Sequence, residues 1–465
     1  MSTPEPPTAG RPRRTALLAP SLAVAVTAAA WLWPGIPGGA KPVLWVYRLA
    51  LIGWVATDLS AGYVGLTAVT ALVALGAVPQ ERVADVLAAD VVWLIFGAFL
   101  LGEAMARSGL AGRLTTSLAA SGCSPRGMGW RLTGWLIALA FVVPSTTGWA
   151  ALMLPLLKSL PPGRDGQLRR CLGLLIPTVV LVSTSVTLTG AAAHLLANEM
   201  LTVGGHAPLS FTRWLVLAGP FGVVASALTA WLVMWRHLPA GDAKLPTVVE
   251  RPTARWSRAE WTTVAVVAGV IGLWTTVGLH PLGFTTVMLL GVVVLVAPRV
   301  GVLVWKDAVK AVPWDMLILA GSAVWLGKAL VGSGASAWVV GRVVAGTGLG
   351  AGDGPVVALL LVGVVCVTAH LYLTSHSARV AALVPPLLAL AGEVGWNATA
   401  VVFVAALGID YCLTFPISSK AVLIYEFDRQ QAGDLFRLSL VLMPAYVLLM
   451  VVFYFAWWVP LGLAF

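Results

Sequence analysis

Two short runs of hydroxyl-bearing residues interrupt apolar stretches of the chain. Ser145-Thr146-Thr147 lies in FVVPSTTGWAALMLPLL, and Ser375-His376-Ser377 lies in LTSHSARVAALVPPLL, 230 positions later. A proline precedes the first run and a glycine follows it, so the chain turns there. A serine or threonine at such a turn can cap the next helix, whose N–H groups and positive dipole end attract anions. The two runs predict a site that holds one anion between two loop tips.

Ionisable residues stand in apolar segments near these runs. Arg379 follows the second run, and Lys420 lies with Ser418 in IDYCLTFPISSKAVLIYEF (409–427), which also contains Asp410. His194, in STSVTLTGAAAHLLANEM, matches Lys420 at an offset of 226 residues. Ionisable residues within a membrane are costly and are functional by default. We expect Arg379 and Lys420 to bind the anion with both hydroxyl runs, and His194, Ser418 and Asp410 to serve an ion or coupling site.

Each of these assignments has a structural alternative. Serine and threonine often bond back to the preceding helical turn, and Lys420 could form an ion pair with Asp410 or Glu426. Histidine titrates near neutral pH, which makes His376 a candidate for coupling as well as for binding. The sequence alone leaves these alternatives open.

The elements that carry these residues must lie in a lipid bilayer. Hydrophobic residues make up 59% of the chain, charged residues 10%, and the mean hydropathy is +0.91, whereas a soluble domain has roughly 25% charged residues. Apolar stretches recur along the chain, and we count about eleven spans of the length that a transmembrane helix needs, plus two re-entrant hairpins. The first stretch, near 15–33, is too long for a signal peptide and is expected to be a retained helix. The fold class is an all-α polytopic membrane protein.

The net charge of +10 has a topological explanation. In this arrangement Lys and Arg collect in loops on one face, as cytoplasmic loops do, which predicts an N-in, C-out topology and no nucleic-acid partner. The composition, rich in Ala, Val, Gly and Trp, suggests a protein of the bacterial plasma (inner) membrane. The four cysteines have no metal-ligand or redox spacing. We therefore expect no cofactor, with a sodium ion left open.

The two halves of the chain resemble each other. AFLLGEAMARSGLAG (98–112) aligns with AVWLGKALVGSGASA (323–337) at an offset of 225, in the same order as the hydroxyl runs. An odd number of crossings separates the copies, so the second copy enters the membrane upside down. Inverted repeats are typical of secondary transporters that bind substrate at irregular helix segments near the midplane.

These features resemble the divalent anion/sodium symporter (dicarboxylate transporter-like) family. The resemblance rests on the hairpins, the repeats, the basic central linker and the run PWDMLILAGSAVWLGKALVGSG, and it covers nearly the whole chain. It implies a homodimer in which a transport domain slides against a scaffold, the elevator mechanism, to carry a small anion with sodium. The implied domains are a cytoplasmic tail 1–14, scaffold 15–128 and 259–350, a cytoplasmic linker 236–258, transport domain 130–235 (hairpin 131–160, broken helix 170–200) and transport domain 354–460 (hairpin 355–390, broken helix 398–427).

The chain departs from the family pattern where the family has asparagine. Thr146 and His376 replace it in the tips, and GAAAH (190–194) and ISSKA (417–421) stand where Thr-Pro-Pro-Asn is usual. Asparagine and carbonyl oxygens suit a hard cation, so these changes favour proton coupling or exchange over sodium coupling. A sodium-coupled dicarboxylate symporter is the alternative. An intramembrane enzyme acting on a lipid-linked substrate is a rival of another class, but no motif groups the carboxylates that it would need, and we expect no enzyme.

Overall fold

The computed structural model describes residues 35–110, 113, 124–141, 167–238, 255–350, 354–373, 375–413 and 432–465. Several predicted features lie outside these residues: the first stretch, most of the hairpin 131–160, and the end of the segment 398–427. Ser145-Thr146-Thr147, Ser418 and Lys420 are among them. The described residues form helices and connecting segments with no strand, which confirms the all-α prediction.

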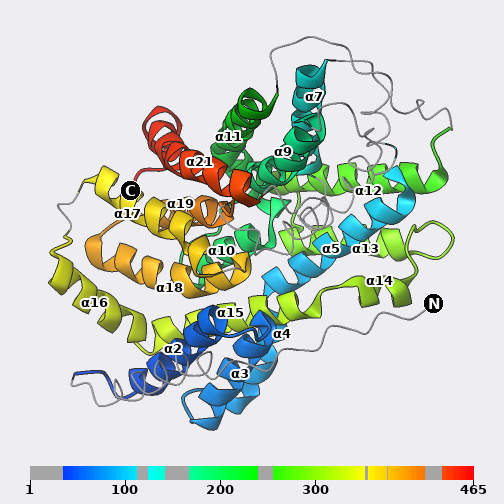
Figure 1. The fold of residues 1–465 in the computed structure, drawn as a ribbon. Coiled ribbons are helices and arrows are strands. Elements are labelled where there is room, and N and C mark those ends of the chain that lie inside the picture. The colour runs from blue at the N-terminus through cyan, green and yellow to red at the C-terminus, as the bar shows by residue number, and fades with distance from the viewer. Residues whose placement is uncertain are drawn as a thin grey trace, which may run out of the picture.

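The first half contains eight described α-helices, joined in places by short 3₁₀ turns (Figure 1). They are α2 (Ala40–Ala56), α3 (Ala61–Ala74), α4 (Asp85–Ala88), α5 (Asp90–Ser108), α7 (Pro125–Leu139), α9 (Gln167–Ser183), α10 (Ala192–Val203) and α11 (Phe211–His237), with 3₁₀ turns η2 (Gln80–Ala84), η3 (Thr184–Val186) and η4 (Leu188–Gly190).

The described helices of the second half follow a comparable order. They are α12 (Arg258–Thr275), α13 (Phe284–Val296), α14 (Trp305–Ala311), α15 (Trp314–Gly332), α16 (Ala335–Thr347), α17 (Pro355–Thr368), α18 (His376–Val394), α19 (Ala398–Asp410) and α21 (Ala432–Phe453), with 3₁₀ turns η5 (Val277–Leu279) and η6 (Ala369–Leu371) and a final π-helical turn η8 (Tyr454–Trp458).

Packing between the halves is reciprocal. Helix α3 packs on α15, and α13 packs on α5; within the halves, α7 contacts α9 and α11, and α17 contacts α19 and α21. Helices α7 and α17 both begin with proline at the first turn, at Pro125 and Pro355, where its missing N–H costs nothing. Their offset of 230 equals that of the hydroxyl runs. The contacts support the internal repeat, and the opposite orientation of the copies stays a prediction.

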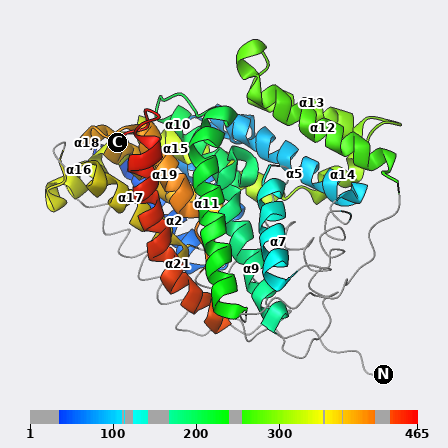
Figure 2. The same ribbon diagram turned by 90° about the horizontal axis from the view of Figure 1, so that it is seen from above.

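The helices fall into neighbouring groups. Helices α7, α9, α11 and α21 lie beside one another (Figures 1 and 2), and α10 and α19 lie near the centre of Figure 1, with α18 packed on both. Helices α2, α3, α15 and α16 form another side of the molecule, where α15 and α16 pack against α18. The centre is thus the place where helices of both halves meet.

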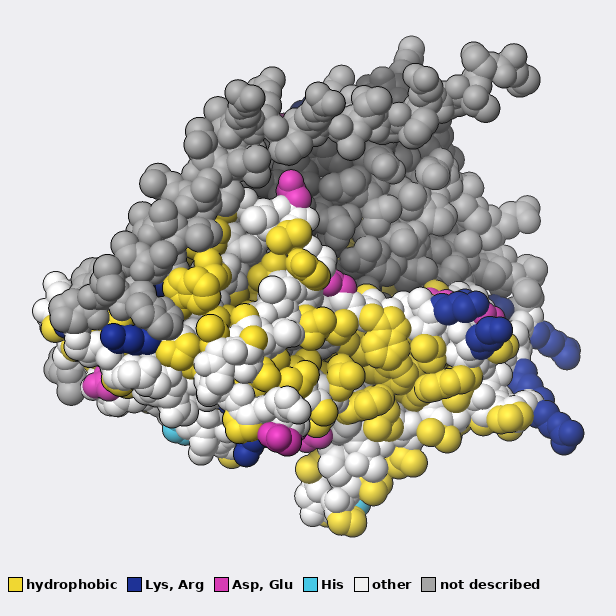
Figure 3. All heavy atoms as spheres, turned by 90° about the horizontal axis from the view of Figure 1, so that it is seen from below, with side chains coloured by type: hydrophobic (Ala, Val, Ile, Leu, Met, Phe, Trp, Pro, Cys, Tyr) yellow, Lys and Arg dark blue, Asp and Glu magenta, His cyan; other side chains and the backbone are white. Residues whose placement is uncertain are grey.

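Length and composition indicate a membrane protein. Five of the described helices are long and apolar enough to cross a bilayer. Large apolar side chains also cover outward surfaces, such as Trp235 on α11 and Leu448 on α21, which are 64% and 63% exposed. Figure 3 shows a broad band of apolar side chains on one face, with basic side chains gathered at one edge. The chain is a multi-pass membrane protein, whereas the count of about eleven spans and the N-in, C-out topology stay predictions.

Candidate functional site

The second hydroxyl run lies at the start of α18. After α17 the chain passes through η6 and an irregular segment before α18 begins at His376. The Ser375 hydroxyl accepts a hydrogen bond from the backbone N–H of Ala378 at 3.3 Å, so Ser375 is the N-cap. Ser377 is buried in the first turn, whereas Ser375 and His376 are half-buried. This tip therefore presents a helix N-terminus, the end that attracts negative charge.

The chain is irregular between α9 and α10. Residues 184–191 form two 3₁₀ turns separated by extended Thr187, and they are buried. Non-helical backbone at membrane depth requires such enclosure by protein. Gly190 is required here, because a Cβ at this position would lie 2.1 Å from the carbonyl oxygen of Thr184. The sequence therefore fixes a tight turn within the segment that leads to His194.

The end of α19 meets this irregular segment. Asp410, the last residue of α19, is 2% exposed and His194 is fully buried. His194 Nε2 lies 2.7 Å from Asp410 Oδ2, and the Thr184 hydroxyl lies 2.9 Å from the same oxygen. His194 Nδ1 faces the carbonyl oxygen of Thr187 at 3.2 Å. The structure thus joins two residues that the sequence placed in the ion or coupling group without pairing them.

Hydrogen-bond chemistry determines what this pair can hold. A carbonyl oxygen only accepts, so Nδ1 of His194 must carry a proton. Nε2 faces a carboxylate oxygen, and one further proton belongs between them, either as imidazolium with carboxylate or as imidazole with carboxylic acid. Losing that proton would leave an acceptor facing an acceptor at 2.7 Å. The geometry of this buried pair therefore accommodates one proton between the two side chains.

Arg379 faces the same end of α19. Its side chain is fully buried, and Nη1 donates to the carbonyl oxygens of Ile409 and of Tyr411, the latter at 3.1 Å. The last carbonyls of a helix lack partners within the helix and carry the negative end of its dipole. The Arg379 guanidinium donates to these carbonyls and places a positive charge at the negative end of the dipole. Its predicted contact with an anion stays a prediction, because the contacts seen here are with backbone.

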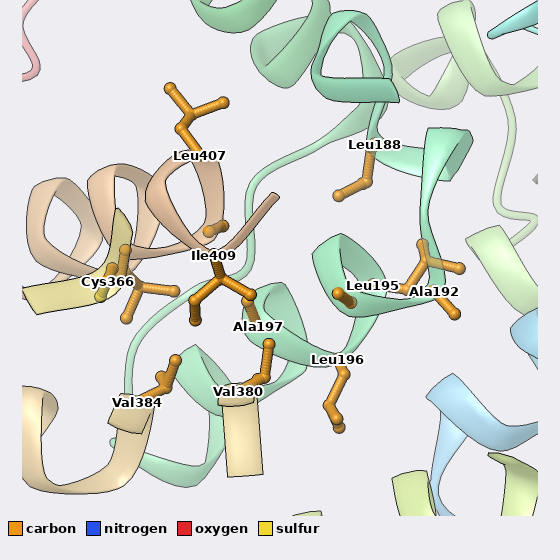
Figure 4. Packing of buried hydrophobic residues seen from close by; sticks show 14 of the residues in the cluster. Leu188, Ala192, Leu195, Leu196, Ala197, Cys366, Val380, Val384, Leu407 and Ile409 are labelled. Carbon is orange, nitrogen blue, oxygen red and sulfur yellow. The ribbon is translucent and has the colours of Figure 1, made fainter. Parts of the chain in front are cut away.

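The structure brings these predicted residues together around one junction. Arg379 lies one turn beyond Ser375, whose carbonyl accepts the Arg379 N–H at 3.0 Å, and its side chain reaches the residue beside Asp410. Apolar side chains of α10, α18 and α19 pack around the junction, and Figure 4 shows Ile409 near Ala197 and Val380. The junction is therefore a charged centre within an apolar surround, where electrostatic interactions are strong.

Sequence reasoning missed two threonines of the irregular segment before α10, one of which contacts Asp410. Thr184 lies 226 positions before Asp410, which is the offset that matched His194 with Lys420. The predicted repeat therefore makes Thr184 and Asp410 equivalent positions, and this is the signal that could have pointed to Thr184. Thr189 Oγ1 is buried and has no hydrogen-bond partner among the described residues. Burial of an unsatisfied hydroxyl costs about 1–3 kcal/mol. A bound polar group at this point would remove that cost.

Within the part of the chain that the structure describes, no three His, Cys, Asp or Glu side chains gather in a way that could hold a metal ion. A sodium ion would need oxygen ligands of another kind, such as backbone carbonyls. The carbonyls at the end of α19 are of that kind, and Arg379 already donates to two of them.

Comparison with known proteins relates this arrangement to transporters. The chain is 28% identical to the citrate/succinate antiporter of Escherichia coli over 77% of its length and 76% of that protein. It is 24% identical to the L-tartrate/succinate antiporter of E. coli, covering 79% of the chain and 78% of the antiporter. A Cupriavidus necator membrane protein is 30% identical, and the match covers 64% of the chain and 60% of that protein.

A solved structure has the same fold. The YdaH transporter of Alcanivorax borkumensis superposes with a TM-score of 0.58 at 16% identity, covering 92% of this chain and all of that one. The family profile described as "Sodium:sulfate symporter transmembrane region" matches residues 14–464. These matches confirm the resemblance inferred from the sequence and the expectation that the protein is no enzyme. The chain belongs to the sodium:sulfate symporter family of membrane transporters.

Proposed function

We propose that the protein is a secondary active transporter that carries a small organic or inorganic anion across the bacterial plasma membrane. The observation that supports this best is the junction at the end of α19, where a capped helix N-terminus, a buried arginine and the pair of His194 and Asp410 lie among helices of both halves. Two relatives are named as antiporters of citrate, succinate or tartrate, which supports a carboxylate as the first anion to test.

The anion lies between the two tips in this proposal. Ser375, His376 and Ser377 contribute one side, with Thr189 and the N-terminus of α18, and Ser145, Thr146 and Thr147 contribute the other. Lys420, with Ser418 beside it, and Arg379 add positive charge. A dianion buried with these groups gains more from each hydrogen bond than it would in water.

Transport follows an elevator-type mechanism in the proposal. The scaffold comprises α2 to α5 and α12 to α16, and the transport domain comprises α7 to α11 and α17 to α21. Contacts within the transport domain, including α9 with α11 and α17 with α19, would let it move as one body with the site inside. A homodimer held through the scaffold would give this body a fixed partner in the lipid bilayer.

Coupling uses a proton or a second anion. Arg379 supplies a permanent cation at the end of α19, where a mobile cation would otherwise find carbonyl oxygens. In this proposal the pair of His194 and Asp410 carries the coupling proton, next to the carbonyls of Ile409 and Tyr411 that Arg379 contacts. Sodium symport is the alternative, supported by the name of the family.

The experiment is anion uptake into proteoliposomes that contain the purified protein. Labelled succinate is offered outside to vesicles that are empty or preloaded with succinate, with sodium or choline, and with or without a pH gradient. We expect uptake to require internal anion or a pH gradient and to proceed equally in choline. Strict dependence on a sodium gradient at every pH would refute proton coupling and exchange and would establish the alternative.

A further inference from the structure

Helix α18 contains two consecutive prolines in its interior, Pro385 and Pro386. Proline has no N–H, so it cannot bond to the carbonyl four residues earlier, and its ring crowds that carbonyl. The carbonyls of Ala381 and Ala382 therefore lose their helical partners. In a membrane protein, a neighbouring side chain commonly satisfies such carbonyls.

Tyr47 of α2 makes this replacement. Its hydroxyl lies 2.7 Å from the carbonyl oxygen of Ala382 and 3.1 Å from that of Ala381. The three residues are buried, with Tyr47 7% exposed. A hydroxyl has one proton to donate, so Tyr47 donates mainly to Ala382 and shares the proton with Ala381. The donor fits a defect that the two prolines create 334 and 335 residues away.

This contact joins the scaffold and the transport domain of the proposed function. Helix α2 packs on α3, α15 and α16 of the proposed scaffold, whereas α18 packs on α10 and α19 of the proposed transport domain and also meets the scaffold helices α15 and α16. Gly327 of α15 packs against α10 and α18. A Cβ at Gly327 would be 3.2 Å from Met200 Sδ and 3.8 Å from Pro385 Cγ. Because Gly327 has no side chain, α15 packs closely against α10 and α18 at this point.

We propose that the Tyr47 hydroxyl and the carbonyls of Ala381 and Ala382 form a latch between scaffold and transport domain. The latch rests on the proposed elevator mechanism, because only a moving α18 would carry these carbonyls away from α2. The prolines keep the carbonyls available in every state, and Tyr47 reaches them in the state seen here. Tyr47 therefore stabilises this state against the one in which α18 has moved.

The size of the effect follows from one hydrogen bond. A net gain typical of a single neutral hydrogen bond corresponds to a shift of about threefold to tenfold in the ratio of the two states. Such a latch is strong enough to set the resting state and weak enough to open during each cycle. Loss of the hydroxyl should thus change the rate of movement more than the affinity of the site.

The direct test measures how often α18 leaves the scaffold, without any transported substrate. In a variant whose native cysteines are replaced, Ala382→Cys places one thiol at the buried contact, and the rate of maleimide labelling in nanodiscs reports its exposure. We expect Tyr47→Phe to increase this rate about threefold to tenfold. Tyr63→Phe is the matched control, because Tyr63 lies on the neighbouring helix α3 and is 59% exposed; it should leave the rate unchanged.

A second pair of variants separates the latch from a general loss of packing. Pro385→Ala with Pro386→Ala restores the N–H groups that satisfy both carbonyls within α18. Tyr47→Phe should then have little further effect on labelling, which is a double-mutant cycle between α2 and α18. An equal labelling rate in wild type and Tyr47→Phe, or the same increase with and without the prolines, would overturn the latch.

The outcome remains distinct from that of the proposed function. If no anion is transported but labelling responds as expected, the transport proposal fails while the contact between α2 and α18 is established. If transport is established, Tyr47→Phe should alter kcat for exchange and leave KM nearly unchanged. A change confined to KM would place Tyr47 in the binding site instead and would overturn the latch.

Discussion

Asp410→Asn is the substitution that tests the proton site most directly. The variant keeps the size of the side chain and a hydrogen bond to His194, but no carboxylate remains to share a proton with Nε2. We expect Nε2 of His194 to accept a hydrogen bond from the new amide in place of the shared proton. A hydrogen bond to a charged group contributes about 1.5–3 kcal/mol and a neutral one about 0.5–1.5 kcal/mol. Asp410→Asn should therefore lower the free energy of unfolding by about 1 kcal/mol.

Asp410→Ala should cost more than Asp410→Asn. Asp410→Ala removes the partner of His194 Nε2 in a buried site, and an unsatisfied buried polar group costs about 1–3 kcal/mol. Asp434→Asn is the matched control, because Asp434 pairs with Arg170, whose side chain is 50% exposed, and exposed pairs contribute about 0–1 kcal/mol. Thermal unfolding in detergent at one pH gives the order Asp434→Asn, Asp410→Asn, Asp410→Ala.

Transport by Asp410→Asn gives the functional half of the same test. If the proton between His194 and Asp410 is the coupling ion, the variant should lose the pH dependence of uptake while anion-for-anion exchange continues. The stability order and the pH profile address different claims. An Asp410→Asn variant as stable as Asp434→Asn would refute the buried pair, and a wild-type pH profile in Asp410→Asn would refute its coupling role.

Two further substitutions test the neighbouring elements. Gly190→Ala places a Cβ against the Thr184 carbonyl and should destabilise the protein by about 3 kcal/mol. The control is Gly134→Ala, on an open face of α7 with nothing within 4 Å, which should be neutral or stabilising by up to about 1 kcal/mol. Equal melting temperatures for the two variants would contradict the tight turn. Arg379→Ala frees the carbonyls of Ile409 and Tyr411, so the melting temperature of the variant should fall below that of the wild type. Adding methylguanidinium or sodium should raise it again, whereas choline, the control, should not. No recovery with either cation would contradict a fixed cation at the end of α19.

The sequence predicted the elements of this site better than its contacts. A hydroxyl run next to an apolar helix was enough to expect a cap, and Ser375 is the N-cap of α18. Ionisable residues in apolar segments identified His194, Asp410 and Arg379. Their partners could not be read, because helical periodicity relates residues on one helix only, whereas His194 and Asp410 meet across 216 residues. Arg379 shows the same limit, since its partners are backbone carbonyls that any sequence carries.

The repeat provides the missing link between sequence and contact. The predicted repeat makes Thr184 and Asp410 equivalent at the offset of 226, and the two side chains touch at 2.9 Å. Equivalent positions of two symmetric copies meet only near the axis that relates them. In the inverted arrangement that we propose, the axis that relates the two copies lies in the membrane plane. A group on this axis is equally related to the two sides of the membrane. The His194–Asp410 pair would then face neither solution preferentially, and movement of its surroundings would decide which side exchanges its proton. A coupling group has to meet that requirement in any transporter that alternates between two faces.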